Sequence, residues 1–323
     1  MNTFVNILLY LGYILIFPGF LFCFFAGFLL TGFSRKLVAR MQRRVGPPVL
    51  QPFYDFFKLL GKETIIPATG HKAAILYAPL VGLASLVTLQ LFIPMNGFAP
   101  FRSTADIIVI LYLLLIPALA EIIGGSASGS PYASVGVSRE MVMIISCELP
   151  LVLIFLAVSK TVGDAQGTGL VFSLSEIVRY QLHNGCLAVK PSMIPAAIAF
   201  LMVIPGETGS HPFDSTEAET EICEGLLAEY SGAPLGVFKL CHAIKVVTMV
   251  SLFIALFFGG IATGSPLINA ILVMLLAVLV TVISISFVHA CTARLKINQI
   301  FKFYWTVVTV PAALSLILAW FGL

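Results

Sequence analysis

The sequence predicts an all-α membrane protein that forms a single polytopic domain over residues 1–323. Hydrophobic residues make up 59% of the chain, charged residues only 10%, and the mean hydropathy is +1.04. About a quarter of the residues are charged in a typical soluble protein. The apolar runs reach the roughly 20 residues that a transmembrane helix needs. The alternating apolar and polar pattern of a membrane barrel strand is absent from them.

Eight apolar runs are candidates for transmembrane helices. They cover residues 4–33, 73–95, 105–125, 140–159, 191–206, 235–258, 266–290 and 303–322. Each is expected to be helical, because backbone polar groups in lipid must bond within their own segment. The first run has no Lys or Arg before it, and the first charged residue is Arg35. It therefore lacks the basic start of a signal peptide and is interpreted as a retained helix.

The placement of Lys and Arg predicts the orientation. Twelve of these residues flank one side of the predicted bundle, in the loops after the first, third and seventh runs, and four flank the other side. The more basic side of a membrane protein is normally cytoplasmic. We therefore expect both termini outside, with the basic loop 34–72 and the acidic loop 207–234 in the cytoplasm.

The basic loop contains the sequence QPFYDFFKLLGKE, in which apolar residues recur at helical spacing. The apolar positions are Phe53, Phe56, Phe57 and Leu60, and the polar positions are Asp55, Lys58 and Lys62. This pattern favours a short amphipathic helix that lies in the plane of the membrane interface. A solvated loop with a single amphipathic turn is the alternative.

The acidic loop holds nearly half of the negative charge of the chain. Seven of the 15 acidic residues lie in it: Glu207, Asp214, Glu217, Glu219, Glu221, Glu224 and Glu229. Asp214 and Glu217 have the spacing of a capping box, which predicts a helix that begins at Asp214. On that helix Asp214, Glu217, Glu221 and Glu224 would share one face, because residues three and four apart are neighbours.

A packed row of carboxyl groups has a chemical consequence. Like charges one helical turn apart repel, and burial beside other carboxylates raises the pKa of a carboxyl group. Some of these groups would then hold protons at neutral pH, and carboxyls with raised and coupled pKa values can act as a proton relay. The alternative is a solvated acidic helix start, in which the carboxylates merely favour the helix dipole.

Charged and titratable residues also lie within the apolar runs, where they are costly and usually functional. They are Glu121, Glu140, Glu148, Lys239, His242 and Lys245. We expect Lys245 to pair with Glu148 or Glu121, because it lies too deep to reach the surface. Two alternatives stay open: Glu140 can pair with Arg139, and Lys239 can extend its ammonium group to the cytoplasmic surface.

The sequence shows no signal for catalysis or for a cofactor. The six cysteines form no CxxC pair, and neither they nor the five histidines have metal-ligand spacing. No phosphate-binding glycine loop or nucleophile motif is present, and no basic and aromatic pattern points to nucleic acid. We therefore expect no catalytic residue, metal or cofactor within this chain.

Four motifs carry a resemblance to a known family. They are RKLVARMQRRVGPPVLQPFYDFFKLLGKE at 35–63, GSASGSPYASVGVSREM at 125–141, ETGSHPFDSTEAETEICEGLLAEYSG at 207–232 and RLKINQIFKFYW at 294–305. The chain resembles the eight-helix quinone-chamber subunit of respiratory complex I. It resembles still more the corresponding subunit of energy-converting, membrane-bound [NiFe] hydrogenases and formate hydrogenlyases. Ser210 and His211 stand where complex I tends to have Asn and Arg, which favours the hydrogenase branch.

The resemblance implies a non-catalytic subunit that anchors a peripheral redox arm in a prokaryotic cell (inner) membrane. The residues implied at the arm interface are Arg35, Lys36, Gln42, Arg44, Gln51, Asp55, Lys58 and Arg139. The acidic loop would line the same junction, and Glu121, Glu140 and Glu148 would continue a charged path, with Lys239 and Lys245, toward antiporter-like membrane subunits. The [NiFe] centre and Fe–S clusters are expected in a large subunit, a small subunit and a ferredoxin-like subunit on the cytoplasmic side.

Two other functions remain as alternatives. One is a complex I subunit with quinone contacts. The other, of a different class, is an autonomous ion or solute transporter, which explains the helices and buried charges but not a basic loop suited to docking a partner.

Overall fold

The structure is a computed structural model that describes residues 2–95, 100–101, 106–167, 169–261 and 265–322, and these residues contain helices and no strand. Seven of the helical segments are long and apolar enough to cross a membrane, and a shorter apolar helix covers Pro191–Glu207. The all-α membrane fold is therefore confirmed, with seven full-length spans and one shorter helix in place of eight equal ones.

The elements follow the apolar runs in order. The first half of the chain contains α1 (Asn2–Leu15), α2 (Phe20–Met41), α3 (Gln51–Leu60), α4 (Lys72–Phe92), α5 (Ile107–Ala127), α6 (Pro131–Gln166) and α7 (Leu174–Asn184). The short turns η2 (Leu187–Val189) and η3 (Pro191–Met193) lead into α8 (Ile194–Glu207). The acidic loop contains α9 (Glu219–Ile222) and η4 (Gly225–Leu227), and α10 (Gly232–Phe257) follows it.

The C-terminal part contains two spans, each with a π-helical turn. The first is α11 (Pro266–Thr281), η5 (Val282–Phe287) and α12 (Val288–Cys291), and the second is α13 (Ile297–Phe303), η6 (Tyr304–Val308) and α14 (Thr309–Trp320). π-helical turns often occur where a helix is adjusted for function. Here η5 places Ser286, which donates a 2.9 Å hydrogen bond to Ser34 of α2.

Two of the predicted runs differ from the helices observed. The run 4–33 was expected to be one helix, but α1 ends at Leu15 and α2 begins at Phe20. Pro18 lies in the break, and proline has no backbone N–H to continue a helix. The fifth run forms α8, whose 14 residues span only about 21 Å, less than the roughly 30 Å of a bilayer core.

The helix α10 lies at the centre of the molecule. Most of its spanning segment is buried, and it packs against α2, α3, α4 and α8. The contact with α2 is close because Gly27 faces the backbone of Ala243: a Cβ at position 27 would lie 2.8 Å from that carbonyl oxygen. The side chains of α10 therefore meet groups on several neighbouring elements.

The amphipathic helix predicted in the basic loop is present as α3, but its apolar face is divided. Phe53 and Phe56 pack against Phe24 and Phe28 of α2, at ring-centroid distances of 5.1–5.7 Å. Phe57 is 59% exposed and Leu60 is 45% exposed. Only the first two residues therefore join the core, and the others remain available to lipid or to another subunit.

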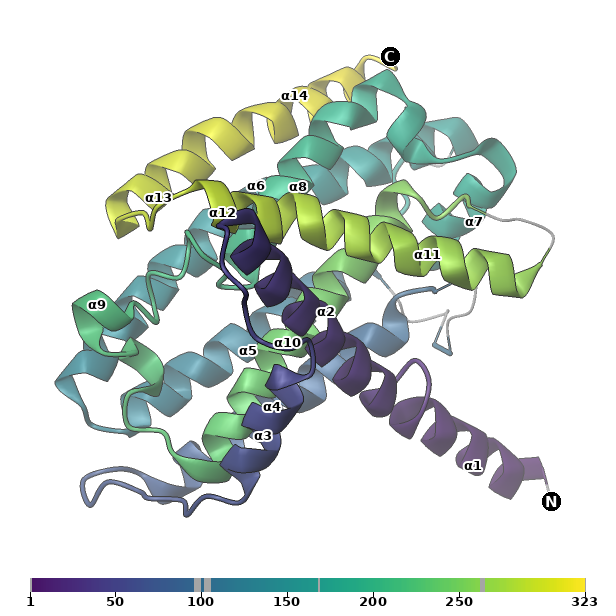
Figure 1. Ribbon diagram of the computed structural model, residues 1–323. Helices are drawn as coiled ribbons and strands as arrows, with labels where there is room; N and C mark the ends of the chain where they lie inside the picture. Colours follow the sequence, from purple (N-terminus) through teal and green to yellow (C-terminus); the bar gives the residue numbers. More distant parts are fainter. Residues whose placement is uncertain (1, 96–99, 102–105, 168, 262–264, 323) are drawn as a thin grey trace.

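The two long charged loops lie at the same end of the molecule. In Figure 1, α3 and α9 lie toward the left, whereas α7 and the N-terminus lie at the opposite end. We call the end with α3 and α9 the loop side. The charge distribution predicts that the loop side is cytoplasmic.

The close approach of α2 and α10 gives a test of the packing. The substitution Gly27→Ala is expected to destabilise the chain by about 1–3 kcal/mol, because the added methyl group forces the two helices apart. Gly12→Ala is the matched control, since a Cβ at Gly12 meets nothing within 4 Å and alanine favours a helix. The measurement is the free energy of unfolding in mixed micelles, and equal stability of the two variants would contradict the packing described here.

Candidate functional site

The acidic loop does not form the helix that its sequence predicts. Only Glu219–Ile222 is α-helical, and the two residues that follow, Cys223 and Glu224, have left-handed backbone angles with φ of 50° and 67°. The predicted capped helix and its single acidic stripe are therefore wrong. Four like charges on one face repel, and the irregular backbone instead carries the carboxylates to separate cations on different elements.

Asp214 is held by Arg294, which lies between α12 and α13. The guanidinium donates two hydrogen bonds to the carboxylate, from Nε to Oδ1 at 2.9 Å and from an Nη to Oδ2 at 2.6 Å. The backbone N–H of Leu295 also donates to the carbonyl of Pro212 at 3.2 Å. A bidentate arginine fixes both distance and orientation, so this pair anchors the start of the acidic loop to the C-terminal helices.

Arg139 of α6 holds the middle of the loop. One of its Nη atoms donates to Glu221 Oε2 at 2.6 Å and to the carbonyl oxygen of Ser215 at 3.0 Å. Arg139 was predicted at the interface with a partner, with Glu140 as its possible counter-ion. The structure instead uses its guanidinium within the chain, and Glu140 points toward a cavity between helices.

His242 of α10 joins the acidic loop to the membrane helices. Its Nε2 lies 3.1 Å from Glu217 Oε1 in the loop and 3.5 Å from Glu121 Oε1 in α5. Glu121 is buried. Burial by itself raises the pKa of the Glu217 carboxyl, but the charge and hydrogen bond of His242, together with the charge of Lys239, outweigh burial and lower it. One imidazole nitrogen therefore contacts two carboxylates that belong to different elements.

Lys245 lies one turn further along α10 and pairs with Glu207 at the end of α8. The distance from Nζ to Oε2 is 3.3 Å, and the two side chains are only 11% and 10% exposed. The expected counter-ions, Glu148 and Glu121, are therefore wrong. Lys245 turns to α8 because Glu121 is already held by His242, and the last turn of α8 brings Glu207 alongside α10.

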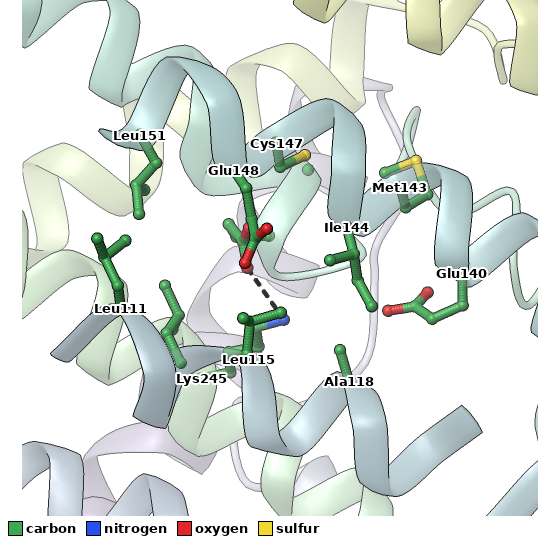
Figure 2. Close-up of a pocket in the computed structure, with 13 residues that line it drawn as sticks. Leu111, Leu115, Ala118, Glu140, Met143, Ile144, Cys147, Glu148, Leu151 and Lys245 are labelled. Carbon is green, nitrogen blue, oxygen red and sulfur yellow. Dashed lines mark ion pairs between the residues drawn. The ribbon is translucent and has the colours of Figure 1, made fainter. Parts of the chain in front are cut away.

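Glu140 and Glu148 line a small cavity beside this pair. The cavity has a volume of about 20 Å³, and its walls come from α5, α6, α8 and α10. In Figure 2 the side chains of Glu140, Glu148 and Lys245 all point into it, among Leu111, Leu115 and Ala118. A space of this volume is large enough for one water molecule, and the carboxylates and the ammonium group offer it polar partners.

A much larger cavity opens on the loop side. Its volume is about 630 Å³, and its walls come from α2, α3, α10, the acidic loop and the segment from α11 to α12. Glu217, Glu224, Lys239 and His242 all line it. The contact between Glu217 and His242 therefore lies in the wall of this cavity, whereas Lys245 lies at the small cavity deeper in the bundle.

The remaining predicted site residues fall outside the buried cluster. Glu229 and Lys239 are exposed, and Glu219 begins α9, although its side chain lies outside the described part of the structure. Among the predicted interface residues, Arg35 lies 3.6 Å from Asp55, which also accepts a 3.0 Å hydrogen bond from Gln51. Arg44 donates to Gln42, Lys36 is half-buried and Lys58 is exposed.

Two residues important to the site were missed by sequence reasoning. His242 was recognised only as one member of a polar stripe, and Arg294 only as a charge that sets topology. The steps of three between Lys239, His242 and Lys245 were the available signal for His242. Arg294 gave no such signal, because its partner Asp214 is 80 residues away. Within the described residues, no three His, Cys, Asp or Glu side chains are arranged to hold a metal ion.

Comparison with known proteins places this geometry in a family. The chain matches the NADH dehydrogenase family over residues 13–320. It is 32% identical over 316 residues to a membrane subunit of the NADH-quinone oxidoreductase of Thermomicrobium roseum, covering 89% of this chain and 88% of the relative. It is 33% identical over 283 residues to hydrogenase-4 component C of Escherichia coli, covering 86% of each chain.

Two further proteins extend the comparison. Formate hydrogenlyase subunit 4 of Escherichia coli is 29% identical over 282 residues, with 86% of this chain and 89% of the relative covered. A solved chain of the membrane-bound sulfane sulfur reductase, an archaeal respiratory membrane complex, superposes with a TM-score of 0.84 at 29% identity, covering 99% of this chain and 100% of that chain. The chain therefore belongs to the NADH dehydrogenase family and is a membrane subunit of the complex I type.

Proposed function

We propose that this chain is the membrane coupling subunit of a multisubunit, energy-converting complex of the [NiFe]-hydrogenase type. The observation that carries the proposal is the contact of His242 with both Glu217 and Glu121, at 3.1 and 3.5 Å. Glu217 belongs to the loop that would meet a peripheral arm, and Glu121 belongs to a membrane helix. A change of charge in the arm is thereby linked to a buried carboxyl in the bundle.

The proton transfer follows from the atoms in contact. A protonated Glu217 gives its proton to Nε2 of His242, and the imidazolium then gives a proton from the same nitrogen to the Glu121 carboxylate. Each step forms one N–H or O–H bond and breaks another, and His242 returns to its starting form. Histidine suits this role because its ordinary pKa lies near neutrality. The charges of Glu121, Lys245 and Glu207 all act on Glu140, which extends the path toward the small cavity.

The surface of the loop side supports docking of a partner. The basic residues of α2 and α3 and the exposed carboxylates of the acidic loop lie at this end, and Phe57 and Leu60 are exposed beside them. We propose that a [NiFe]-type large subunit, an Fe–S small subunit and a ferredoxin-like subunit dock here. They would hold the [NiFe] centre and the Fe–S clusters. Antiporter-like subunits would lie within a prokaryotic cell membrane beside the α5 and α6 face.

The relatives favour a complex over an autonomous transporter. Subunits named for quinone reduction, for hydrogenase and for formate hydrogenlyase all align over most of this chain, and the superposed chain comes from a sulfane sulfur reductase complex. A scaffold shared among different reactions is expected if the reaction occurs in a neighbouring subunit. The complex I function is the second candidate, and the NADH-quinone oxidoreductase relative from Thermomicrobium roseum is the observation that favours it.

The relay is tested by removing the proton-accepting nitrogen. In the intact complex reconstituted in liposomes, His242→Gln is expected to lower ion translocation coupled to hydrogen evolution by about a hundredfold, which is typical of losing a proton-transfer group. Glu121→Gln should have a similar effect. Glu221→Gln is the matched control in the same loop, because it breaks an exposed ion pair worth at most about 1 kcal/mol. Unchanged coupling in the His242 and Glu121 variants would rule the relay out.

The charge state of Glu217 gives a second test. Its pKa is lowered in the folded chain, so its ionised form contributes stability that is fully present above the ordinary carboxyl pKa and is lost as pH falls through the lowered value. Glu217→Gln is expected to remove this part of the acid sensitivity, measured as unfolding in micelles between neutral and acid pH. Glu176→Gln, on α7 at the opposite end of the molecule, should leave the pH profile unchanged. A wild-type profile in the Glu217 variant would show that this carboxyl is not held in its charged form.

A further inference from the structure

The 630 Å³ cavity has a charged end and an apolar end. On α10 its lining runs from Leu235 to Val246, a distance of about 16 Å along the helix axis. The outer end, near the loop side, carries Lys58, Lys62 and Lys239. The cavity therefore reaches from the membrane surface into the spanning part of the bundle.

The inner end of the cavity is largely apolar. Phe28 and Leu30 of α2, Ala243 and Val246 of α10, and Ile285 of η5 line it. The helices α2 and α11 form the wall toward the bilayer, and their outer faces expose large apolar side chains. A hydrocarbon chain in the cavity would lie close to the surrounding lipid.

The outer end of the cavity has an excess of positive charge. Of its carboxylates, Asp55 is paired with Arg35 at 3.6 Å and Glu217 with His242 at 3.1 Å. Within the described part of the chain, none of the ammonium groups of Lys58, Lys62 and Lys239 lies within ion-pair distance of a carboxylate. Three cations therefore remain against one carboxylate, that of Glu224.

We propose that this cavity binds an anionic phospholipid, with the phosphate at Lys58, Lys62 and Lys239 and an acyl chain along Phe28, Leu30 and Ile285. Basic pockets between transmembrane helices on the cytoplasmic side bind anionic headgroups, and phosphate forms strong charge-assisted hydrogen bonds with ammonium groups. A neutral quinone leaves the three cations unbalanced. An acidic protein segment balances them but leaves the apolar end unfilled. The volume lies within the range of about 300–1,000 Å³ for small-molecule sites.

The test uses the intact complex after detergent delipidation. Phosphatidylglycerol, phosphatidylcholine, a quinone and inorganic phosphate are each added, and bound molecules are counted by native mass spectrometry. One phosphatidylglycerol is expected to be retained more tightly than phosphatidylcholine. A phosphatidylglycerol with a photoreactive acyl chain should label peptides of α2 and η5, which locates the site among the subunits.

Substitutions link retention to the cavity. Lys58→Gln and Lys62→Gln are each expected to weaken phosphatidylglycerol binding about fivefold, and Lys72→Gln is the matched control because Lys72 is exposed and does not line the cavity. Leu30→Trp narrows the apolar end without a change of charge and should reduce both retention and labelling of η5. These two kinds of variant separate the headgroup contact from the chain contact.

Four outcomes would overturn the proposal. They are equal retention of phosphatidylglycerol and phosphatidylcholine, preferential retention of the quinone, binding of inorganic phosphate as tight as that of the lipid, and crosslinking of Lys62 to an acidic segment of a partner subunit that excludes lipid. The proposal does not depend on the relay, because Lys58, Lys62 and Leu30 take no part in the contact of His242 with Glu217 and Glu121.

Discussion

The structure depends on the requirement that a carboxylate withdrawn from water meets a positive charge. An isolated buried carboxylate is so unfavourable that it must be paired or protonated. The central helix α10 provides the cations, with His242 and Lys245 one turn apart. They contact Glu121 of α5, Glu217 of the acidic loop and Glu207 of α8. The same ion pairs therefore bring these elements together and form the charged path between the loop side and the interior.

The acidic loop illustrates how charge can replace regular secondary structure. Its backbone is helical over only a few residues, yet Arg294, Arg139 and His242 hold it at three positions on three different parts of the fold. Irregular backbone of this kind is tolerated in a membrane protein where it is covered by protein or lines a cavity. Because each carboxylate has its own partner, a change at one pair does not require the whole loop to move.

The two cavities give the loop side and the interior different chemistry. The small cavity near Lys245 admits about one water molecule, which suits proton transfer over short distances. The large cavity is open to the loop side and carries uncompensated ammonium groups above an apolar interior. Glu217 and His242 lie in the wall of the large cavity, so they connect the charge path with a space that another molecule can enter.

By itself, the sequence determined the helical membrane fold, the positions of most helices, the amphipathic helix α3 and the set of buried charges. These depend on local composition and spacing: apolar runs of sufficient length must be helical in lipid, and helical periodicity places Phe53 and Phe56 together. Tertiary structure alone decided the ion pairs. The acidic loop follows the capping rule in sequence but not in space, because repulsion among its carboxylates is relieved by Arg139, Arg294 and His242. Those cations come from elements far apart in the chain, so which carboxylate meets which cation was settled by helix packing, on which local sequence carries no information.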